Sequence, residues 1–141
     1  MKSVYLICIV CCLFLFTHAK AGEDGLIEVR GPGGGDLASF IDGFSNVNTK
    51  PDHEIVVTLA SNPTTGYQWQ VMKPLAESTV KLVSHVYDHP QTGLVGAGGQ
   101  EIWVFRTLGP GEAEIVLGYL RSWEKGKLPA YIRIIRLKVN P

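Results

Sequence analysis

Apolar and polar residues alternate along most of the chain from Glu54 onward, with a period of two residues and no sustained period of 3.6. This alternation is typical of β-strands that bury one face, and the glycine, proline and asparagine residues between the segments indicate turns. The pattern predicts strands at residues 55–59, 67–72, 80–87, 101–106, 113–117 and 131–139. A further strand is expected around Val47.

Six or seven short strands in about 95 residues predict an all-β fold, an immunoglobulin-like antiparallel β-sandwich or barrel of about seven strands. In such a sandwich, successive connections lie at alternate ends. The connections at residues 61–67, 88–99 and 121–129 are each separated by two strands, so we expect these three loops to lie together at one end. The turn Gly109-Pro110-Gly111 belongs at the opposite end.

The sequence also indicates which tryptophans are buried and whether an edge strand is open to pairing with another molecule. Trp69 and Trp103 lie within strand patterns, so we expect them in the core rather than as platforms for a ligand. No extended apolar edge strand stands out, and Arg136 and Lys138 on the last strand would discourage pairing between edges. The pattern therefore does not favour a structural subunit of a larger secreted assembly.

The first 21 residues have the pattern of a secretory signal peptide. Lys2 precedes an apolar run at residues 4–16, and Ala19-Lys20-Ala21 matches a small-x-small cleavage site. The run is shorter than the roughly 20 apolar residues of a membrane span. We therefore expect cleavage before Gly22, no stable membrane insertion, and a secreted protein or one held in vesicles or lysosome-like compartments.

The rest of the chain divides into an N-terminal extension of uncertain structure at residues 22–44 and a folded domain at residues 45–141. Within the extension, residues 26–29 have the composition of a strand. The glycines at 31 and 33–35 break any regular element, and Asp36 is a candidate cap for a helical turn reaching Phe44.

Composition and charge exclude several classes of function. All three cysteines (Cys8, Cys11 and Cys12) lie inside the apolar run, so no disulfide is expected after cleavage. Loss of Lys2 and Lys20 leaves 11 basic residues against 13 acidic ones, a net charge of −2. This balance gives no support for binding to nucleic acid or to anionic membranes.

No catalytic constellation is recognisable, so we expect neither an enzyme nor a cofactor. The chain after Gly22 holds no cysteine, no serine in a nucleophile-elbow pattern and no readable pair of catalytic carboxylates. His85 and His89, with Asp88 between them, have a spacing that binds metals on helices. Here the spacing crosses a strand end and a loop, so no metal site is expected.

The three loops carry the most informative residues. Pro63 fixes its own φ and favours an extended Asn62, while Gly66 allows a positive φ. Taken singly, the loops have ordinary interpretations: a β-turn, a glycine linker, and a surface arginine beside a half-buried tryptophan. Their sequences are Asn62-Pro63-Thr64-Thr65-Gly66-Tyr67, Leu94-Val95-Gly96-Ala97-Gly98-Gly99 and Arg121-Ser122-Trp123.

Together and in this order, the motifs resemble the chagasin family of cysteine-protease inhibitors, whose hallmarks are an NPTTG loop, a GxGG loop and an RPW-like loop. The resemblance covers residues 45–139, and Ser122 stands where the family usually has proline. It implies an immunoglobulin-like fold and reversible, tight binding to papain-like (cathepsin-like) cysteine peptidases. We expect the inhibitor to be a monomer.

The resemblance also implies how the loops bind. The glycine loop would lie over the catalytic cysteine of the peptidase, with the other two loops flanking it in the cleft. Thr64 and Thr65 would contact one side of the cleft, and Arg121 and Trp123 the other. Loss of the proline at Ser122 should make the third loop more flexible.

Physical arguments support this reading beside the resemblance. A loop that approaches a buried thiolate benefits from glycine, because it lacks a Cβ atom. Tryptophan and arginine are the residue types most enriched at interface hot spots, so Trp123 is the expected anchor. The alternative is a secreted immunoglobulin-like adhesion or carbohydrate-binding module, which the fold alone does not exclude.

Overall fold

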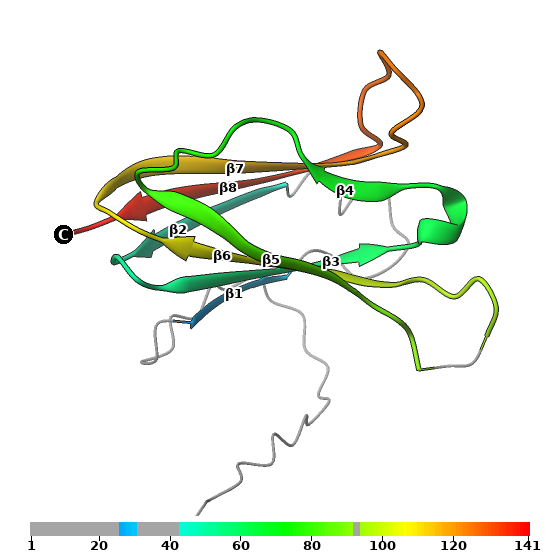
Figure 1. Ribbon diagram of the computed structural model, residues 1–141, viewed down its shortest axis with the longest axis horizontal. Helices are drawn as coiled ribbons and strands as arrows, with labels where there is room; N and C mark the ends of the chain where they lie inside the picture. Colours follow the sequence, from blue (N-terminus) through cyan, green and yellow to red (C-terminus); the bar gives the residue numbers. More distant parts are fainter. Residues whose placement is uncertain (1–25, 31–42, 92–93) are drawn as a thin grey trace, which may run out of the picture.

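The computed structural model describes residues 26–30, 43–91 and 94–141. In these residues, eight strands form two sheets that face each other (Figure 1). The strands are β1 (Leu26–Arg30), β2 (Phe44–Thr49), β3 (Glu54–Ser61), β4 (Gln68–Val71), β5 (Val80–Asp88), β6 (Gly99–Thr107), β7 (Gly111–Leu120) and β8 (Tyr131–Val139). A single turn of 3-10 helix, η2 (Pro63–Thr65), lies between β3 and β4. The expected all-β sandwich is confirmed.

Only part of the N-terminal segment for which we made predictions lies within the described residues. The signal peptide and residues 36–42 of the expected helical turn lie outside them. β1 occurs where strand composition was noted, and it pairs with β3, so part of the expected extension belongs to a sheet. Phe44 begins β2, one residue before the expected start of the domain.

The relative directions of neighbouring strands follow from a chain that reverses direction from one strand to the next. One sheet has the order β1-β3-β6-β5 and the other β2-β8-β7-β4. An odd-numbered and an even-numbered neighbour are therefore antiparallel, as in β3–β6, β5–β6, β4–β7 and β7–β8. Neighbours of the same parity, β1–β3 and β2–β8, are parallel. The expected antiparallel arrangement therefore holds for four of the six described strand pairs, and these two parallel pairs are the exceptions.

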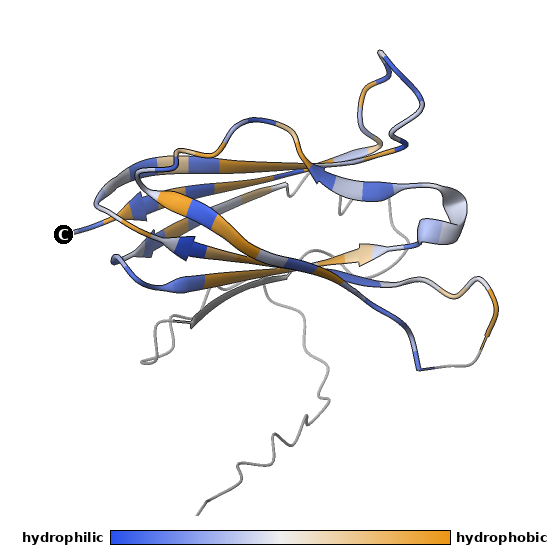
Figure 2. Cartoon of the chain, in the orientation of Figure 1, coloured by the Kyte–Doolittle hydropathy of each residue, from blue (hydrophilic) through white to orange (hydrophobic). Residues whose placement is uncertain are grey.

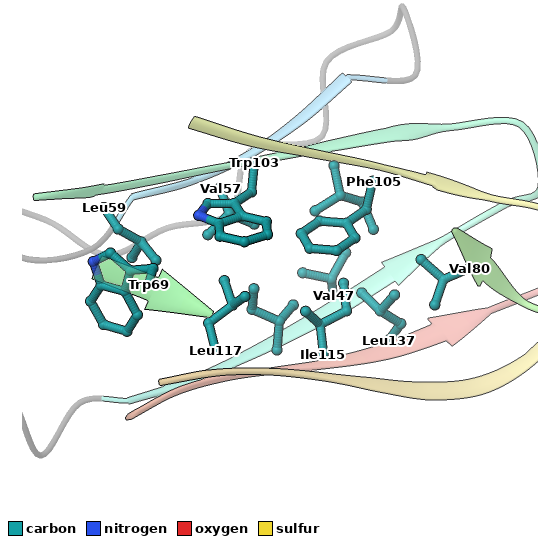
Figure 3. Packing of buried hydrophobic residues seen from close by; sticks show 12 residues of the cluster. Val47, Val57, Leu59, Trp69, Val80, Trp103, Phe105, Ile115, Leu117 and Leu137 are labelled. Carbon is teal, nitrogen blue, oxygen red and sulfur yellow. The ribbon is translucent and has the colours of Figure 1, made fainter. Parts of the chain in front are cut away.

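The core lies between the inward faces of the two sheets, where the alternation places apolar side chains (Figure 3). Trp69 and Trp103 retain only 8% and 4% of their exposure, which confirms their expected place in the core. Phe105 from one sheet and Ile115 from the other are fully buried. Apolar burial of this kind is the main favourable term in folding.

β5 departs from its sequence pattern. The alternation predicts one buried face along residues 80–87, but only Val80 is buried. β5 is the edge of its sheet, and its register with β6 shifts between Leu82 and Ser84. Leu82, Val83 and Val86 consequently remain 40–54% exposed. Figure 2 shows that β5 carries several apolar residues, drawn in orange.

The expectation about strand edges is therefore wrong in two respects. An edge strand with exposed apolar side chains is present, and it is β5. β8, whose Arg136 and Lys138 were expected to protect an edge, lies inside its sheet between β2 and β7. The sequence does not reveal this position because the pairing of β2 with β8 joins residues far apart in the chain.

The β3–β4, β5–β6 and β7–β8 connections extend from one end of the sandwich, on the right in Figure 1. The β6–β7 turn, with Gly109 and Pro110, lies at the opposite end. This arrangement is the one expected from strand counting. In the described part of the chain, no helix has the length and apolar character needed to cross a membrane.

The inward and outward faces can be tested by one matched pair of substitutions. Ile115→Ala should lower the free energy of unfolding by about 2–5 kcal/mol, because it leaves a cavity in the core. Ile132→Ala on the neighbouring β8, where the side chain is 44% exposed, should lower it by less than about 1 kcal/mol. Urea unfolding measures both values. Equal losses would contradict the assigned faces.

Candidate functional site

The first loop is held by the side chain of its own first residue. Asn62 Oδ1 accepts hydrogen bonds from the backbone N–H of Thr64 at 3.2 Å and from its hydroxyl at 2.5 Å. The Thr65 hydroxyl donates to the Asn62 carbonyl at 2.6 Å. The Gly66 N–H donates to the Pro63 carbonyl at 2.9 Å, and Gly66 has a φ of +80°. Both threonine hydroxyls thus serve the loop itself.

The exposed tip of this loop is shorter than the expected range 61–67. Ser61 is the last residue of β3 and is only 4% exposed. Tyr67 is half-buried, and its ring stacks on Tyr119 with 5.3 Å between centroids. The outward-facing residues of the loop are therefore Pro63, Thr64 and Thr65.

The second loop presents an apolar tip. Asp88 and Gly99, the ends of the expected range, belong to β5 and β6. Leu94 is 72% exposed and Val95 fully exposed. The Ala97 N–H donates to the Leu94 carbonyl at 3.3 Å, and Gly96 has a φ of +81° with no atom near the position of a Cβ. This tip is therefore a tight turn that displays two apolar side chains.

The glycines at the base of the second loop have a structural purpose. A Cβ at Gly99 would overlap the Asp88 carbonyl and the Tyr87 hydroxyl. A Cβ at Gly98 would lie 3.3 Å from the Ser61 carbonyl. Gly99 therefore allows β5 and β6 to approach each other, and Gly98, which is exposed, also brings the second loop against the first.

The third loop rests on the first through Arg121 and Trp123. Arg121 Nε donates to the Thr65 carbonyl at 3.1 Å, and the guanidinium lies 4.5 Å from the centroid of the Tyr67 ring. The Trp123 ring covers Gly66, because a Cβ there would overlap its six-membered ring. Trp123 is nonetheless 64% exposed, and Ser122 is also exposed.

These contacts make the three loops one continuous surface. Asn62 Nδ2 donates to the Gly96 carbonyl at 3.1 Å, which joins the first loop to the second. The Asn62 N–H donates to the Tyr119 hydroxyl at 2.9 Å, which joins the first loop to β7. Arg121 and Trp123 complete the link to the third loop. The guanidinium of Arg121 is engaged within this surface rather than extended from it.

Glu124 stabilises the third loop by accepting from two cations. Its carboxylate lies 3.3 Å from the Lys127 ammonium and 3.3 Å from Arg121 Nη1. The hydrogen bond from Lys127, together with that from Arg121, outweighs desolvation and holds the pKa of the Glu124 carboxyl below its usual value. The Glu124 carboxylate therefore stays ionised to a lower pH than an unpaired carboxylate would, and it keeps its contact with the guanidinium.

Beneath the loops lies a buried acid that belongs to none of the three motifs. Glu101 is only 2% exposed and bonds to Ser61, Trp69 and His85. A signal was available, because the alternation places Glu101 on the same face as Trp103 and therefore in the core. A charge on a core face indicates a specific set of partners.

The two histidines of the considered metal motif have separate partners. His85 contacts Glu101 at 2.7 Å and stacks on Trp103, whereas the His89 ring packs edge-on against Tyr87. Within residues 26–30, 43–91 and 94–141, no three His, Cys, Asp or Glu side chains gather in a group able to hold a metal ion.

The β-sandwich thus presents three loops at one end, and the first of them contacts both of the others. The model of the chagasin family peptidase inhibitors (I42) matches residues 48–139 of this chain. The chain therefore belongs to the chagasin family of peptidase inhibitors. This membership confirms the resemblance noted in the three motifs.

Relatives and solved structures are consistent with this assignment. Amoebiasin-2 of Entamoeba histolytica is 36% identical over 80 residues, 53% of this chain and 61% of that protein. Amoebiasin-1 of the same organism is 37% identical over 84 residues, 60% of this chain and 78% of that protein. The crystal structure of the cysteine protease inhibitor EhICP2 from Entamoeba histolytica is similar with a TM-score of 0.56 and 25% identity, covering 69% of this chain and 96% of that one.

The contact between the first and third loops can be tested at two glycines with nearly the same φ. The left-handed φ alone should make alanine cost about 1 kcal/mol of stability at either position. Gly66→Ala should cost more and shift the NMR signal of the Trp123 indole N–H, since its Cβ displaces that ring. Gly96→Ala should leave the signal in place. Identical effects would contradict the packing of Trp123 on Gly66.

Proposed function

We propose that this protein is a reversible, tight-binding inhibitor of papain-like cysteine peptidases and that it occupies their active-site cleft with its three-loop end. The observation that carries this proposal is the bonding of all three family motifs into one surface with an apolar tip. Membership in a family of peptidase inhibitors and similarity to the cysteine protease inhibitor EhICP2 support the same function.

The shape of the second loop suits the centre of a narrow cleft. Gly96 and Gly98 are exposed, and no atom lies near the position of a Cβ at Gly96. A peptidase cleft accommodates extended backbone, and glycine allows close approach to a catalytic thiolate. We assign Val95 and residues 96–98 to the centre of the contact and Thr64 and Thr65 to one flank.

The rigidity of the loops explains how a protein can occupy a protease without being cut. Hydrolysis requires that a peptide bond reach a near-attack geometry on the thiolate. Hydrogen bonds from Asn62 and Arg121 to the carbonyls of Gly96 and Thr65 restrain the backbone of the central second loop and of the first loop beside it. They also reduce the entropy lost on binding, which is about 0.5–1.5 kcal/mol for each side chain that becomes ordered.

Trp123 and Arg121 have different roles in this proposal. Trp123 presents a large, mostly exposed ring that is already positioned by Gly66, so it is the energetic anchor on the second flank. Arg121 acts mainly by fixing the third loop to the first. Ser122 is exposed and lacks the fixed φ of proline, so the greater flexibility expected of this loop remains a prediction.

The alternative of an adhesion or carbohydrate-binding module is not favoured, because the family and the similar proteins are inhibitors. The same family membership supports the expectation that the chain is not an enzyme. We also propose that residues 1–21 direct the chain into the secretory pathway and are removed. The apolar run before Ala19-Lys20-Ala21 supports this proposal.

The function is tested by inhibition assays on the full chain, expressed through the secretory pathway of a host cell. We expect inhibition of papain or of a cathepsin-like peptidase with a constant below about 1 μM, without accumulation of cleavage products. Absence of inhibition across a panel of papain-like peptidases would refute the proposed function.

The role of Trp123 is tested by truncation. Trp123→Ala should raise the inhibition constant at least about tenfold, while the melting temperature changes by less than about 2 °C, because most of the ring is already exposed. The control is Leu108→Ala, which removes a partly exposed apolar side chain at the opposite end and should leave inhibition unchanged. Unfolding of Trp123→Ala, or unaltered inhibition, would show that Trp123 is not the anchor.

A further inference from the structure

The first loop crosses from one sheet to the other, so its two ends share no ladder of backbone hydrogen bonds. Ser61 ends β3 in one sheet, and β4, which begins two residues after Gly66, belongs to the other. The position of the loop tip therefore depends on what fixes the separation of these two ends. Side-chain contacts across the sandwich must do so.

One carboxylate oxygen bonds both ends of this loop. Glu101 Oε1 accepts from the Ser61 hydroxyl at 2.6 Å and from the backbone N–H of Trp69 at 3.0 Å. Hydrogen bonds to an ionised acceptor are shorter and stronger than those between neutral groups. The Trp69 indole N–H adds a second link between the same strands by donating to the Ala60 carbonyl at 3.0 Å.

The other oxygen of Glu101 is also engaged. His85 Nε2 lies 2.7 Å from Glu101 Oε2, and the His85 ring stacks on Trp103 with 3.6 Å between centroids. A carboxylate that retains 2% of its exposure would be strongly destabilising without such partners. Glu101 itself stands two residues after Gly99, at the base of the second loop. This one side chain therefore contacts strands that border two of the three loops.

We propose that Glu101 is a positioning residue for the inhibitory surface. It fixes the distance between the end of β3 and the start of β4, which the first loop connects. It thereby sets the position of residues 62–66 relative to the second loop. Its side chain is buried beneath the loops, so it acts through Ser61 and Trp69 and does not touch a bound peptidase. This inference rests on the proposed function.

The conservative variant Glu101→Gln distinguishes the hydrogen-bonding role of the side chain from the effect of its charge. In Glu101→Gln the amide oxygen can accept from Ser61 and Trp69, while the amide N–H group can donate to His85 Nε2 in the tautomer that leaves this nitrogen as an acceptor. In Glu101→Leu both ends of the loop lose their common acceptor. Thr107→Val is the matched control: Thr107 is a buried polar residue at the opposite end of the same strand, bonded to Lys50 and His53.

Two measurements are made on each variant. One is the dissociation rate from a peptidase that the wild type inhibits, and the other is hydrogen exchange at the backbone amides of Thr65 and Gly66. Glu101→Leu should raise the dissociation rate at least about tenfold and accelerate exchange at both amides. Glu101→Gln should remain within about threefold of wild type. Thr107→Val should lower the melting temperature and change neither loop measurement.

Three outcomes would overturn the proposal. The first is a folded Glu101→Leu with wild-type dissociation and exchange. The second is loss of inhibition by Thr107→Val equal to that of Glu101→Leu at the same loss of stability, which would make the effect global. The third applies if Glu101→Leu does not fold, in which case Ser61→Ala, which removes one hydrogen-bond donor to Glu101, takes its place. Ser61→Ala should accelerate exchange at the Gly66 amide, and an unchanged exchange rate would refute the positioning role of Glu101.

The exchange measurement needs no peptidase. If the wild type inhibits no papain-like enzyme, the proposed function fails while the effect of Glu101 on the loop is still decided by the exchange rates at Thr65 and Gly66. Failure of the function and failure of the positioning role are thereby distinguished.

Discussion

The loop end of this protein depends on the hydrogen bonds of one residue, Asn62. Its backbone N–H bonds to the Tyr119 hydroxyl on β7, its side-chain oxygen to Thr64, and its side-chain nitrogen to the Gly96 carbonyl. Each group thus reaches a different element. An aspartate in this place would retain the acceptor but lose the donor to Gly96, so an amide is the side chain that satisfies all of these partners.

Most of the fold could be predicted from the sequence, because a period of two residues fixes which side chains face the core. Strand counting likewise placed the three loops at one end. The parallel pairs and the exposed face of β5 could not be predicted, since they depend on which strands become neighbours. The same limit applies to the site: alternation placed Glu101 on a buried face, but its partners Ser61, Trp69 and His85 come from three other strands.

The motifs that indicate the function are largely devoted to the architecture of the loops. The hydroxyls of Thr64 and Thr65 bond within the first loop, Arg121 bonds across to it, and Gly99 makes room for neighbouring strands. The groups left for a partner are chiefly apolar and exposed. Preorganisation of this kind raises affinity by lowering the cost of ordering rather than by adding contacts.

The packing of Trp123 on Gly66 limits how the surface can diversify. Any side chain at residue 66 would occupy the volume of the indole, so the first and third loops cannot mutate independently. Val95 at the tip of the second loop carries no such restriction, because its side chain is fully exposed. Adaptation of this scaffold to a new target should therefore proceed mainly through substitutions at the tip of the second loop. A substitution at residue 66 would require a compensating change at Trp123.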